Sequence, residues 1–369
     1  LPSVYTFMEK VIDEVLLMYK EADAPINTIH IGGDEVPEGV WKRAPSCQKL
    51  IGAQYDGDNY IRDFDDFWMY YISKMKQLLD KKGLTVSGWE EVGMNKLYVG
   101  ENKIMVPNEN FADKNTQLHV WLNMPGWGSE DLPYKLANLG YKIVLSPVSN
   151  NYFDLAYCKS PDEPGYNWGG YTDIDKTFYF VPFDNSKTAK EDAEGNPLDK
   201  SVFMGKEKLT EIGKKNIVGI EGLLWSENLH TPEEMYYLLL PKLLGVSERA
   251  WAKDPEWTSI NDSISFQNNY NRDWSSFVNL IGKRQLKMLD HYNGGYIYRI
   301  PPPGALIKND TVFVNNQFPG LTLKYSENGS EPSVKSKTLN RFILKKGTFK
   351  ICAVNSAGRK SKTITIKNN

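Results

Sequence analysis

Asp34 and Glu35 are adjacent carboxylates at the end of an apolar run, a position suited to acid–base chemistry. The run, residues 26–31, is rich in β-branched residues and stops at two glycines, which predicts a short buried strand. Neighbouring side chains of a regular strand point to opposite faces. Two acids that serve one site therefore require a bend in the backbone, which Gly32 and Gly33 permit. From this stretch alone, two solvated loop acids are an equally good interpretation.

Four later segments also read as strands, and each leads into aromatic or acidic residues. The predicted strands are residues 84–87, 117–122, 141–146 and 217–225. The residues at or after their ends are Trp89, Trp121, Tyr152, Asp154, Trp225 and Glu227. Indole faces pack on the C–H faces of sugars, and carboxylates bind hydroxyls and carry out acid–base chemistry. Together these residues predict a sugar-binding pocket.

Helices are predicted between and around these strands. Their ranges are residues 1–22, 59–82, 131–139, 231–252 and 274–292. Alternating strands and helices indicate a parallel sheet with helices outside, and functional residues at successive strand ends are typical of a (β/α)8 TIM barrel. A doubly wound sheet is the rival fold, but no glycine-rich phosphate loop follows an early strand. Since five strands do not close a barrel, roughly three would be missing.

The pattern changes near residue 298. Pro301–Gly304 predicts a stiff linker, and short alternating segments separated by glycine-containing turns follow it. We therefore expect a catalytic domain in residues 1–297. Residues 298–369 are expected to form a small all-β, Ig-like sandwich with an accessory role.

The overall composition of the 369 residues is that of an ordinary globular protein, with 41% hydrophobic and 24% charged residues. The net charge of −2 argues against nucleic acid or an anionic membrane as the main partner. No apolar run is long enough to span a membrane. The three cysteines, Cys47, Cys158 and Cys352, are too scattered for a disulfide framework or a zinc site. No metal or cofactor is expected.

The residues 30–35, His-Ile-Gly-Gly-Asp-Glu, resemble the signature of the family-twenty glycoside hydrolases, the β-N-acetylhexosaminidases. Further matching motifs follow in the family's order: Gly88-Trp89-Glu90-Glu91, Val120-Trp121, Tyr152-Phe153-Asp154 and Trp225-Ser226-Glu227. Residues 324–332 are similar to the β-sandwich that ends many chitobiase-like members. The resemblance implies that the chain holds strands 4–8 of the catalytic barrel.

The resemblance also implies a retaining mechanism in which the 2-acetamido oxygen of the substrate attacks the anomeric carbon. Asp34 would orient the acetamido group, and Glu35 would be the general acid and then the general base. The resemblance implies that Trp89, Trp121 and Trp225 shape the acetamido pocket and its floor, and that Tyr152 makes a hydrogen bond to the acetamido oxygen. It also implies hydroxyl contacts for Asp154 and Glu227, and either a further wall or an acceptor-site platform for Trp168. The expected partner is an N-acetylhexosamine-terminated glycan or chitin oligosaccharide. A secreted, periplasmic or cell-surface location is expected, and the oligomeric state is left open.

Two departures from the family pattern stand out. Glu221 occupies a position where members often have Gln, so its carboxylate must find a partner in the interior. The sugar-binding Arg that the family places after its first strand, and the His–Asp pair of its early strands, are not in this sequence. The absence of these residues predicts that the barrel lacks its first three strands here.

Two other functions remain open. One is a non-catalytic protein that binds N-acetylhexosamine on the same scaffold. The other is a barrel hydrolase that pairs Glu35 with Glu227 and accepts sugars without an acetamido group. His30 and His119 are interpreted as hydrogen-bonded residues of the barrel interior, and Trp68 as a packing residue of its helix. Glu90 and Glu91 are interpreted as solvated or structural.

Overall fold

The computed structural model describes residues 1–100, 102–112, 115–340 and 342–368. The chain divides into two compact units. The first comprises Leu1–Ser149, Pro182–Asp192 and Asn196–Glu221, and the second comprises Asn150–Val181, Ala193–Gly195 and Gly222–Asn369. The predicted boundary between residues 297 and 298 stays a prediction.

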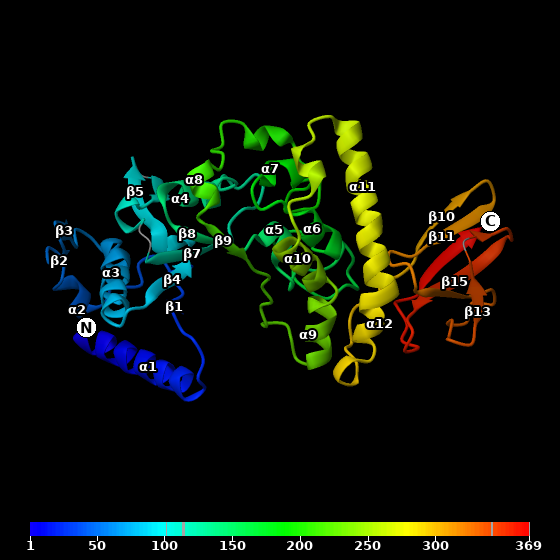
Figure 1. Ribbon diagram of the computed structural model, residues 1–369, viewed down its shortest axis with the longest axis horizontal. Helices are drawn as coiled ribbons and strands as arrows, with labels where there is room; N and C mark the ends of the chain where they lie inside the picture. The colour runs from blue at the N-terminus through cyan, green and yellow to red at the C-terminus, as the bar shows by residue number, and fades with distance from the viewer. Residues whose placement is uncertain (101, 113–114, 341, 369) are drawn as a thin grey trace. The chain divides into compact units, whose positions relative to one another are not determined.

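A five-stranded parallel sheet forms the centre of the first unit (Figure 1), in the order β1-β4-β7-β8-β9. The strands are β1 (Thr28–His30), β4 (Thr85–Trp89), β7 (Thr116–Val120), β8 (Lys142–Leu145) and β9 (Ile217–Ile220). All five predicted strands are confirmed. Since the strands are parallel, their carboxyl ends lie at one edge of the sheet, where the predicted site residues follow.

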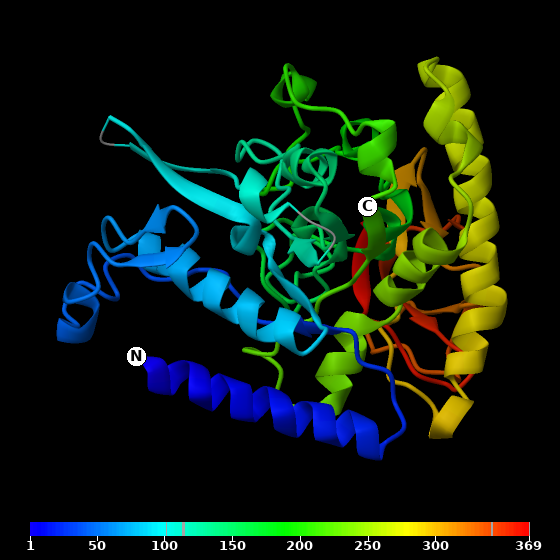
Figure 2. The ribbon, with the colours of Figure 1, turned by 60° about the vertical axis from the view of Figure 1, so that its left-hand side comes forward.

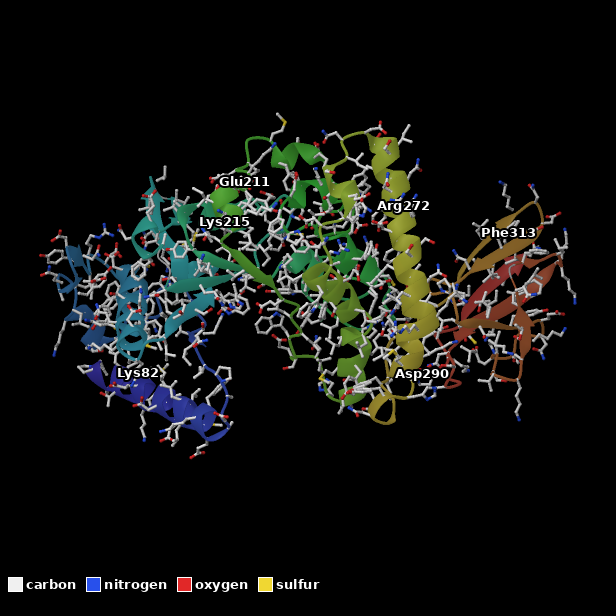
Figure 3. All side chains as sticks on the ribbon, in the orientation of Figure 1. Lys82, Glu211, Lys215, Arg272, Asp290 and Phe313 are labelled. Carbon is white, nitrogen blue, oxygen red and sulfur yellow. The ribbon has the colours of Figure 1, made fainter. Side chains whose placement is uncertain are left out.

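Helices α1 (Pro2–Glu21) and α3 (Asp66–Lys81) run alongside each other beside this sheet (Figure 2). Ile12 of α1 packs with Met75 and Leu79 of α3 and with Val86 of β4 in one buried cluster. Lys82, labelled in Figure 3, follows α3 and forms ion pairs with Asp13, at 2.5 Å, and Glu9, at 3.5 Å. The first unit also holds α2 (Pro45–Gln48), α4 (Leu132–Leu139), α7 (Asn185–Thr188) and α8 (Glu211–Lys214).

The helix predicted for residues 59–82 begins later than expected. Residues 54–60 instead form a hairpin of β2 (Gln54–Asp56) and β3 (Asn59–Tyr60), with Gly57 in the left-handed region at φ +51°. An Asp-Gly pair between two strands favours such a turn, and it overrides the helical spacing of the apolar residues here. A second hairpin joins β5 (Met94–Val99) and β6 (Asn102–Pro107).

Helices and two antiparallel sheets build the second unit. Its helices are α6 (Ile174–Tyr179), α9 (Pro232–Leu239), α10 (Lys242–Trp251), α11 (Ser263–Leu280) and α12 (Leu286–Leu289). The short helix α5 (Val148–Asn151) has its first two residues in the first unit and its last two in the second. Thr231 caps α9 as expected, because its Oγ1 accepts a hydrogen bond from the Glu234 N–H at 3.2 Å. The helix predicted for 231–252 is interrupted at Pro241, and the one predicted for 274–292 is the later part of a run that begins at Ser263.

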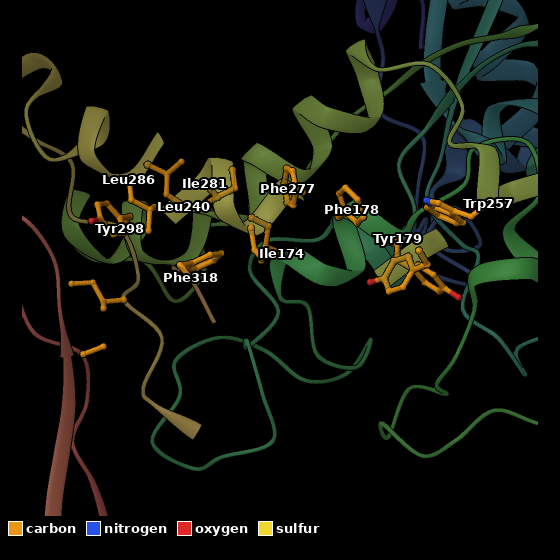
Figure 4. Close-up of a cluster of buried hydrophobic side chains, with 14 of the residues drawn as sticks. Ile174, Phe178, Tyr179, Leu240, Trp257, Phe277, Ile281, Leu286, Tyr298 and Phe318 are labelled. Atoms are coloured by element: carbon orange, nitrogen blue, oxygen red, sulfur yellow. The ribbon is translucent and has the colours of Figure 1, made fainter. Parts of the chain in front are cut away.

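A large aromatic-rich core holds these helices together (Figure 4). The rings of Phe178 and Phe277 stack with centroids 4.5 Å apart, and those of Tyr179 and Trp257 stack at 5.5 Å. The same core includes Phe318 and Ala353, which belong to the terminal β region.

The terminal region is built of strands. One sheet has the order β10-β11-β14 and the other β13-β12-β15-β16, and every pairing is antiparallel. The strands are β10 (Gly304–Lys308), β11 (Thr311–Asn315), β12 (Thr322–Ser326), β13 (Lys337–Leu339), β14 (Phe342–Ile343), β15 (Gly347–Val354) and β16 (Ile364–Asn368). Val312, Leu323 and Phe349 are among the side chains that both sheets contribute to one buried cluster. Across the described ranges, no helix is both long and apolar enough to cross a membrane.

Candidate active site

The Asp34–Glu35 pair lies on a sharply bent extension of β1. Ladder hydrogen bonds continue past the strand, from Ile31 N to Ser87 O at 2.8 Å and from Trp89 N to Gly32 O at 3.0 Å. The backbone then takes positive φ angles at Gly32 (+75°), Gly33 (+112°) and Glu35 (+49°). The predicted bend is therefore confirmed. Glu35 itself is in a conformation that non-glycine residues rarely adopt, a kind of strain that clusters at functional sites.

Close packing around the bend explains the glycines. A Cβ atom on Gly33 would lie 2.6 Å from Val92 Cγ2 and 3.2 Å from the Trp68 ring. A Cβ on Gly88 would lie 2.5 Å from the same Val92 atom. Trp68 is buried and donates its indole N–H to the Glu91 carbonyl at 3.1 Å, so its interpretation as a packing residue is confirmed.

Glu90 positions the chain that carries Trp121. Its carboxylate is 2% exposed and accepts hydrogen bonds from the backbone N–H groups of Trp121, at 3.1 Å, and Leu122, at 3.0 Å. Burial, together with the charge of Glu91, raises the Glu90 pKa well above the usual carboxyl range. Glu90 is thus structural, one of the two roles expected for it, and it is not solvated.

Glu91 belongs to the electrostatic environment of the Asp34–Glu35 pair. Burial is the main reason that the pKa of Glu91 is raised, and the charges of Asp34 and Glu35 add to it. One oxygen of Glu91, Oε2, is buried and has no hydrogen-bond partner within the described part of the chain. Glu91 is therefore an acid that the fold keeps close to the predicted catalytic pair.

A polar chain connects the ends of three neighbouring strands. The carboxylate of Glu221, just after β9, accepts hydrogen bonds from His119 Nδ1 at 2.7 Å and from Ser146 Oγ at 2.6 Å. Burial opposes ionisation of Glu221, but these two hydrogen bonds outweigh it and lower the Glu221 pKa. The interior partner that Glu221 was predicted to need is thus present.

His30 and Trp89 extend this chain toward β1 and β4. The His30 ring lies 4.9 Å from the His119 ring and 5.1 Å from the Trp89 indole, between ring centroids. Burial and the neighbouring His119 lower the pKa of His30. Both histidines therefore contact neighbouring aromatic rings, and the structural role assigned to them stays a prediction.

A second group of site residues lies in the second unit. Tyr152 pairs with Leu223 in a single parallel bridge, and its ring meets those of Trp168, at 5.9 Å, and Trp225, at 6.3 Å, edge to face. Tyr152 is buried, whereas Trp168 and Trp225 are exposed. An aromatic corner of this kind offers both a ring face and a phenolic hydroxyl to a ligand.

Asp154 adds a buried carboxylate to this group. Its side chain is 3% exposed, and its Oδ1 atom has no hydrogen-bond partner among the residues the structure describes. Burial raises the Asp154 pKa to about 6, the Trp225 N–H and the charge of Lys242 oppose that rise, and Glu227 adds to it. A buried carboxylate oxygen without a partner is suited to bind a ligand hydroxyl.

All nine predicted site residues therefore occur in two groups. The first unit contains Asp34, Glu35, Trp89 and Trp121, and the second contains Tyr152, Asp154, Trp168, Trp225 and Glu227. Their roles stay a prediction. Sequence reasoning missed Lys242, a fully buried lysine next to Asp154. The signal was a single lysine in the apolar run 238–244. In the described ranges, no cluster of three or more His, Cys, Asp or Glu side chains could hold a metal ion.

Comparison with known families decides the classification. Residues 1–254 match the family described as glycosyl hydrolase family 20, catalytic domain. The chain belongs to glycosyl hydrolase family 20. Residues 285–363 of this family-20 chain match a second family, the chitobiase/β-hexosaminidase C-terminal domain.

Named relatives cover nearly all of this family-20 chain. It is 30% identical to a β-hexosaminidase of Vibrio vulnificus, over 94% of the chain and 41% of that protein. It is also 30% identical to an N,N'-diacetylchitobiase of Vibrio harveyi, over 88% of the chain and 38% of that protein. The chain thus spans about two fifths of the length of these relatives.

A solved structure shows the same fold. The family-20 exo-β-N-acetylglucosaminidase of Vibrio harveyi, in complex with N-acetylglucosamine, superposes with a TM-score of 0.52 at 26% identity. The match covers 81% of the chain and 36% of the Vibrio protein. The fold of this family-20 member is therefore that of a glycoside hydrolase with its C-terminal domain.

Proposed function

We propose that this chain is part of an exo-acting β-N-acetylhexosaminidase that removes terminal β-linked N-acetylglucosamine or N-acetylgalactosamine with retention of configuration. The observation that carries the proposal is the Asp34–Glu35 pair, held at a strand end by a strained, glycine-dependent bend in a family-20 chain. Binding alone does not require a general acid, so this pair favours an enzyme over a lectin.

In the proposed reaction, the acetamido carbonyl oxygen attacks the anomeric carbon while Glu35 gives its proton to the glycosidic oxygen. The bond to the leaving group breaks and an oxazolinium ion forms, whose positive charge Asp34 stabilises while it orients the acetamido group. Glu35, now a carboxylate, takes a proton from a water molecule as the water oxygen attacks the anomeric carbon. The bond between that carbon and the acetamido oxygen breaks, which opens the oxazolinium ring and restores the acetamido group. The sugar leaves with its original configuration, and Glu35 is again protonated.

The remaining site residues bind the sugar in this proposal. Trp89, Trp121 and Trp225 enclose the acetamido group, and the Tyr152 hydroxyl donates a hydrogen bond to its oxygen. Asp154 and Glu227 accept hydrogen bonds from sugar hydroxyls, and Trp168 adds a further wall. The buried Oδ1 of Asp154, which has no partner in the described residues, supports its part in this assignment.

We also propose that three further strands, outside this chain, complete a (β/α)8 barrel with the five described here, and that the terminal sheets form an Ig-like sandwich. Two features of the first unit support the barrel. β1 and β9 are the outer strands of an open sheet. Helix α1 exposes apolar side chains at helical spacing on one face, namely Val4, Phe7, Val11 and Met18. We also propose a secreted, periplasmic or cell-surface location, because chitin and glycan chains are substrates that an enzyme encounters outside the cytoplasm.

The test compares two substrates of the full-length protein, an aryl N-acetyl-β-glucosaminide and an aryl β-glucoside. We expect turnover of the first alone, reduced about 10²–10⁴-fold by Glu35→Gln because proton transfer is lost. Glu38→Gln, at an exposed glutamate three residues on, is the matched control and should keep full activity.

Other outcomes identify the alternatives. Equal turnover of both substrates would contradict assistance by the acetamido group and would favour a hydrolase that pairs Glu35 with Glu227. Tight binding of N-acetylglucosamine without turnover would favour the sugar-binding protein.

A further inference from the structure

Lys242, at the start of α10, is a charged residue with no exposed surface. Its ammonium group donates hydrogen bonds to the carbonyl oxygens of Phe153, at 2.8 Å, and Leu155, at 2.6 Å. It also lies 3.8 Å from the centre of the Tyr157 ring. The two carbonyls belong to the residues on either side of Asp154, so a single side chain holds the backbone on both flanks of that carboxylate.

The same segment is held from its other sides as well. Asp154 O accepts a hydrogen bond from Tyr166 N at 2.8 Å, and Phe153 N donates to Leu223 O at 2.6 Å. A Cβ atom on Gly165 would lie 2.6 Å from Asp154 O, so the neighbouring chain approaches as closely as only glycine allows. The position of the Asp154 backbone is therefore fixed by several contacts, and among those named here Lys242 supplies a charged group.

Burying an ammonium group costs desolvation free energy, and a side chain that only filled space would not need the charge. Burial lowers the pKa of Lys242 to about 7, which shows how poorly this site solvates the charge. An apolar side chain of similar length would avoid that cost, but it would leave the carbonyl oxygens of Phe153 and Leu155 without this donor. The charge of Lys242 acts on Asp173 and Glu163 as well as on Asp154. At Asp154, whose flanking carbonyls Lys242 also holds, it lowers the carboxyl pKa against the effect of burial.

We propose that Lys242 is a positioning residue for substrate binding: by holding the carbonyls of Phe153 and Leu155 and placing a positive charge near Asp154, it aims that carboxylate at a sugar hydroxyl. Lys242 does not touch the sugar itself. The inference deepens the function proposed above and rests on the role of Asp154 in it.

The experiment is a double-mutant cycle in the full-length protein with Lys242→Met, Asp154→Asn and the combined variant. We expect each single variant to lower kcat/KM for the aryl N-acetyl-β-glucosaminide about 10–100-fold, since each spoils one hydroxyl contact. The combined variant should be no worse than Asp154→Asn, because Lys242 acts through Asp154. Lys253→Met, at an exposed lysine just after α10, is the control and should leave kcat/KM unchanged.

A series of monodeoxy substrates locates the effect. Removing the hydroxyl that Asp154 binds should abolish the difference between wild type and Lys242→Met, and it should leave the effect of Glu35→Gln intact. A purely structural role of Lys242 would lower activity on every substrate by the same factor, and the two losses would multiply in the combined variant. Either result would overturn the proposal.

Folding is checked for each variant by circular dichroism and thermal unfolding. Should Lys242→Met not fold, Lys242→Arg keeps the charge and two donors, and partial recovery of kcat/KM with that variant would support the proposal. Failure of both variants to fold would assign Lys242 to structure alone and overturn it. A wild-type protein without turnover would contradict the proposed function instead, and the same cycle would then be measured as affinity for N-acetylglucosamine by calorimetry, with the same two outcomes.

Discussion

His119 Nδ1 and Glu221 Oε1 lie 2.7 Å apart and join the end of β7 to the residue that follows β9. Ser146, just after the strand between them, donates a hydrogen bond to the same oxygen at 2.6 Å. One carboxylate oxygen therefore ties three adjacent strand ends together. The end of β7, which Trp121 follows directly, is therefore held in place by the carboxylate of Glu221.

Replacing Glu221 with Gln should weaken this tie. We expect the free energy of unfolding at pH 7 to fall by about 1–2 kcal/mol, because a charge-assisted hydrogen bond becomes a neutral one. The measurement is urea unfolding followed by circular dichroism. Glu211→Gln, at an exposed glutamate on α8 (Figure 3), is the control and should change little.

The free energy of unfolding at acidic pH gives a second measurement for Glu221→Gln. The folded-state pKa of Glu221 is lowered, so the unfolded chain binds the proton more readily. Its stabilising effect is therefore complete above the unfolded pKa, about 4.3, and is lost as the pH falls through the folded one. Wild type should lose more stability than Glu221→Gln below about pH 4, and parallel profiles would contradict this account.

Gly33→Ala should damage the bend that carries Asp34 and Glu35. Gly32 and Gly33 both have positive φ angles, but only at Gly33 would a Cβ meet other atoms, with Val92 at 2.6 Å. We expect Gly32→Ala to cost about 1 kcal/mol of stability from backbone strain alone. Gly33→Ala should cost about 1–3 kcal/mol more, because packed atoms must also move. Thermal unfolding of both variants measures the difference, and equal losses would show that the contact with Val92 is not rigid.

Glu90→Ala should release the chain at Trp121. It leaves the N–H groups of Trp121 and Leu122 without their acceptors, at a cost of about 1–3 kcal/mol for each group that stays buried. Glu90→Gln keeps one acceptor oxygen and should cost less. Unfolding in guanidinium chloride ranks the variants, and an Ala variant as stable as the Gln variant would mean that water replaces the carboxylate.

The pH dependence of Glu90 has the opposite sign to that of Glu221. The folded-state pKa of Glu90 is raised by burial, so the folded protein holds this proton more tightly than the unfolded chain does. The resulting stability is complete below the unfolded carboxyl pKa and is lost as the pH rises through the folded one. Wild type should therefore lose stability on the alkaline side of the carboxyl range, and Glu90→Gln should show a flatter profile there.

Arg299→Met should destabilise the second unit strongly. Arg299 and Glu163 form a buried ion pair at 2.8 Å, with side chains 5% and 3% exposed. Removing one partner leaves the other charge buried, which typically costs about 3–5 kcal/mol. The combined Arg299→Met and Glu163→Gln variant should recover part of that loss. Arg272→Met, on α11 (Figure 3), is an exposed control, and thermal unfolding distinguishes the three.

Local signals in the sequence were sufficient for the strands, the bend at Gly32 and Gly33, and the cap at Thr231. Each depends on residues within a few positions of one another. The helix predicted for residues 59–82 is present as α3, but its predicted start was wrong, because a local Asp-Gly turn places residues 59 and 60 in a hairpin. The need of Glu221 for a partner could be predicted from its chemistry, although the identity of that partner could not.

The buried contacts that escaped prediction join residues far apart in the sequence. Lys242 is 89 positions from Phe153, and Arg299 is 136 positions from Glu163. No periodicity in a single sequence reports which buried carbonyl a lysine will reach. Such pairs become visible only once the fold has brought them together.

The residues at the start of the terminal β region have a further consequence for protein engineering. Tyr298 and Ile300 are buried in the same core as the helices, and Asp290 accepts hydrogen bonds from Tyr298, Asn355 and Ser356. The terminal sheets therefore share a core and hydrogen bonds with the helices that precede them, and they do not form a separable module. Moving these sheets to another enzyme, or cleaving the chain at residues 301–303, would remove Phe318 and Ala353 from the core and expose the side chains packed against them.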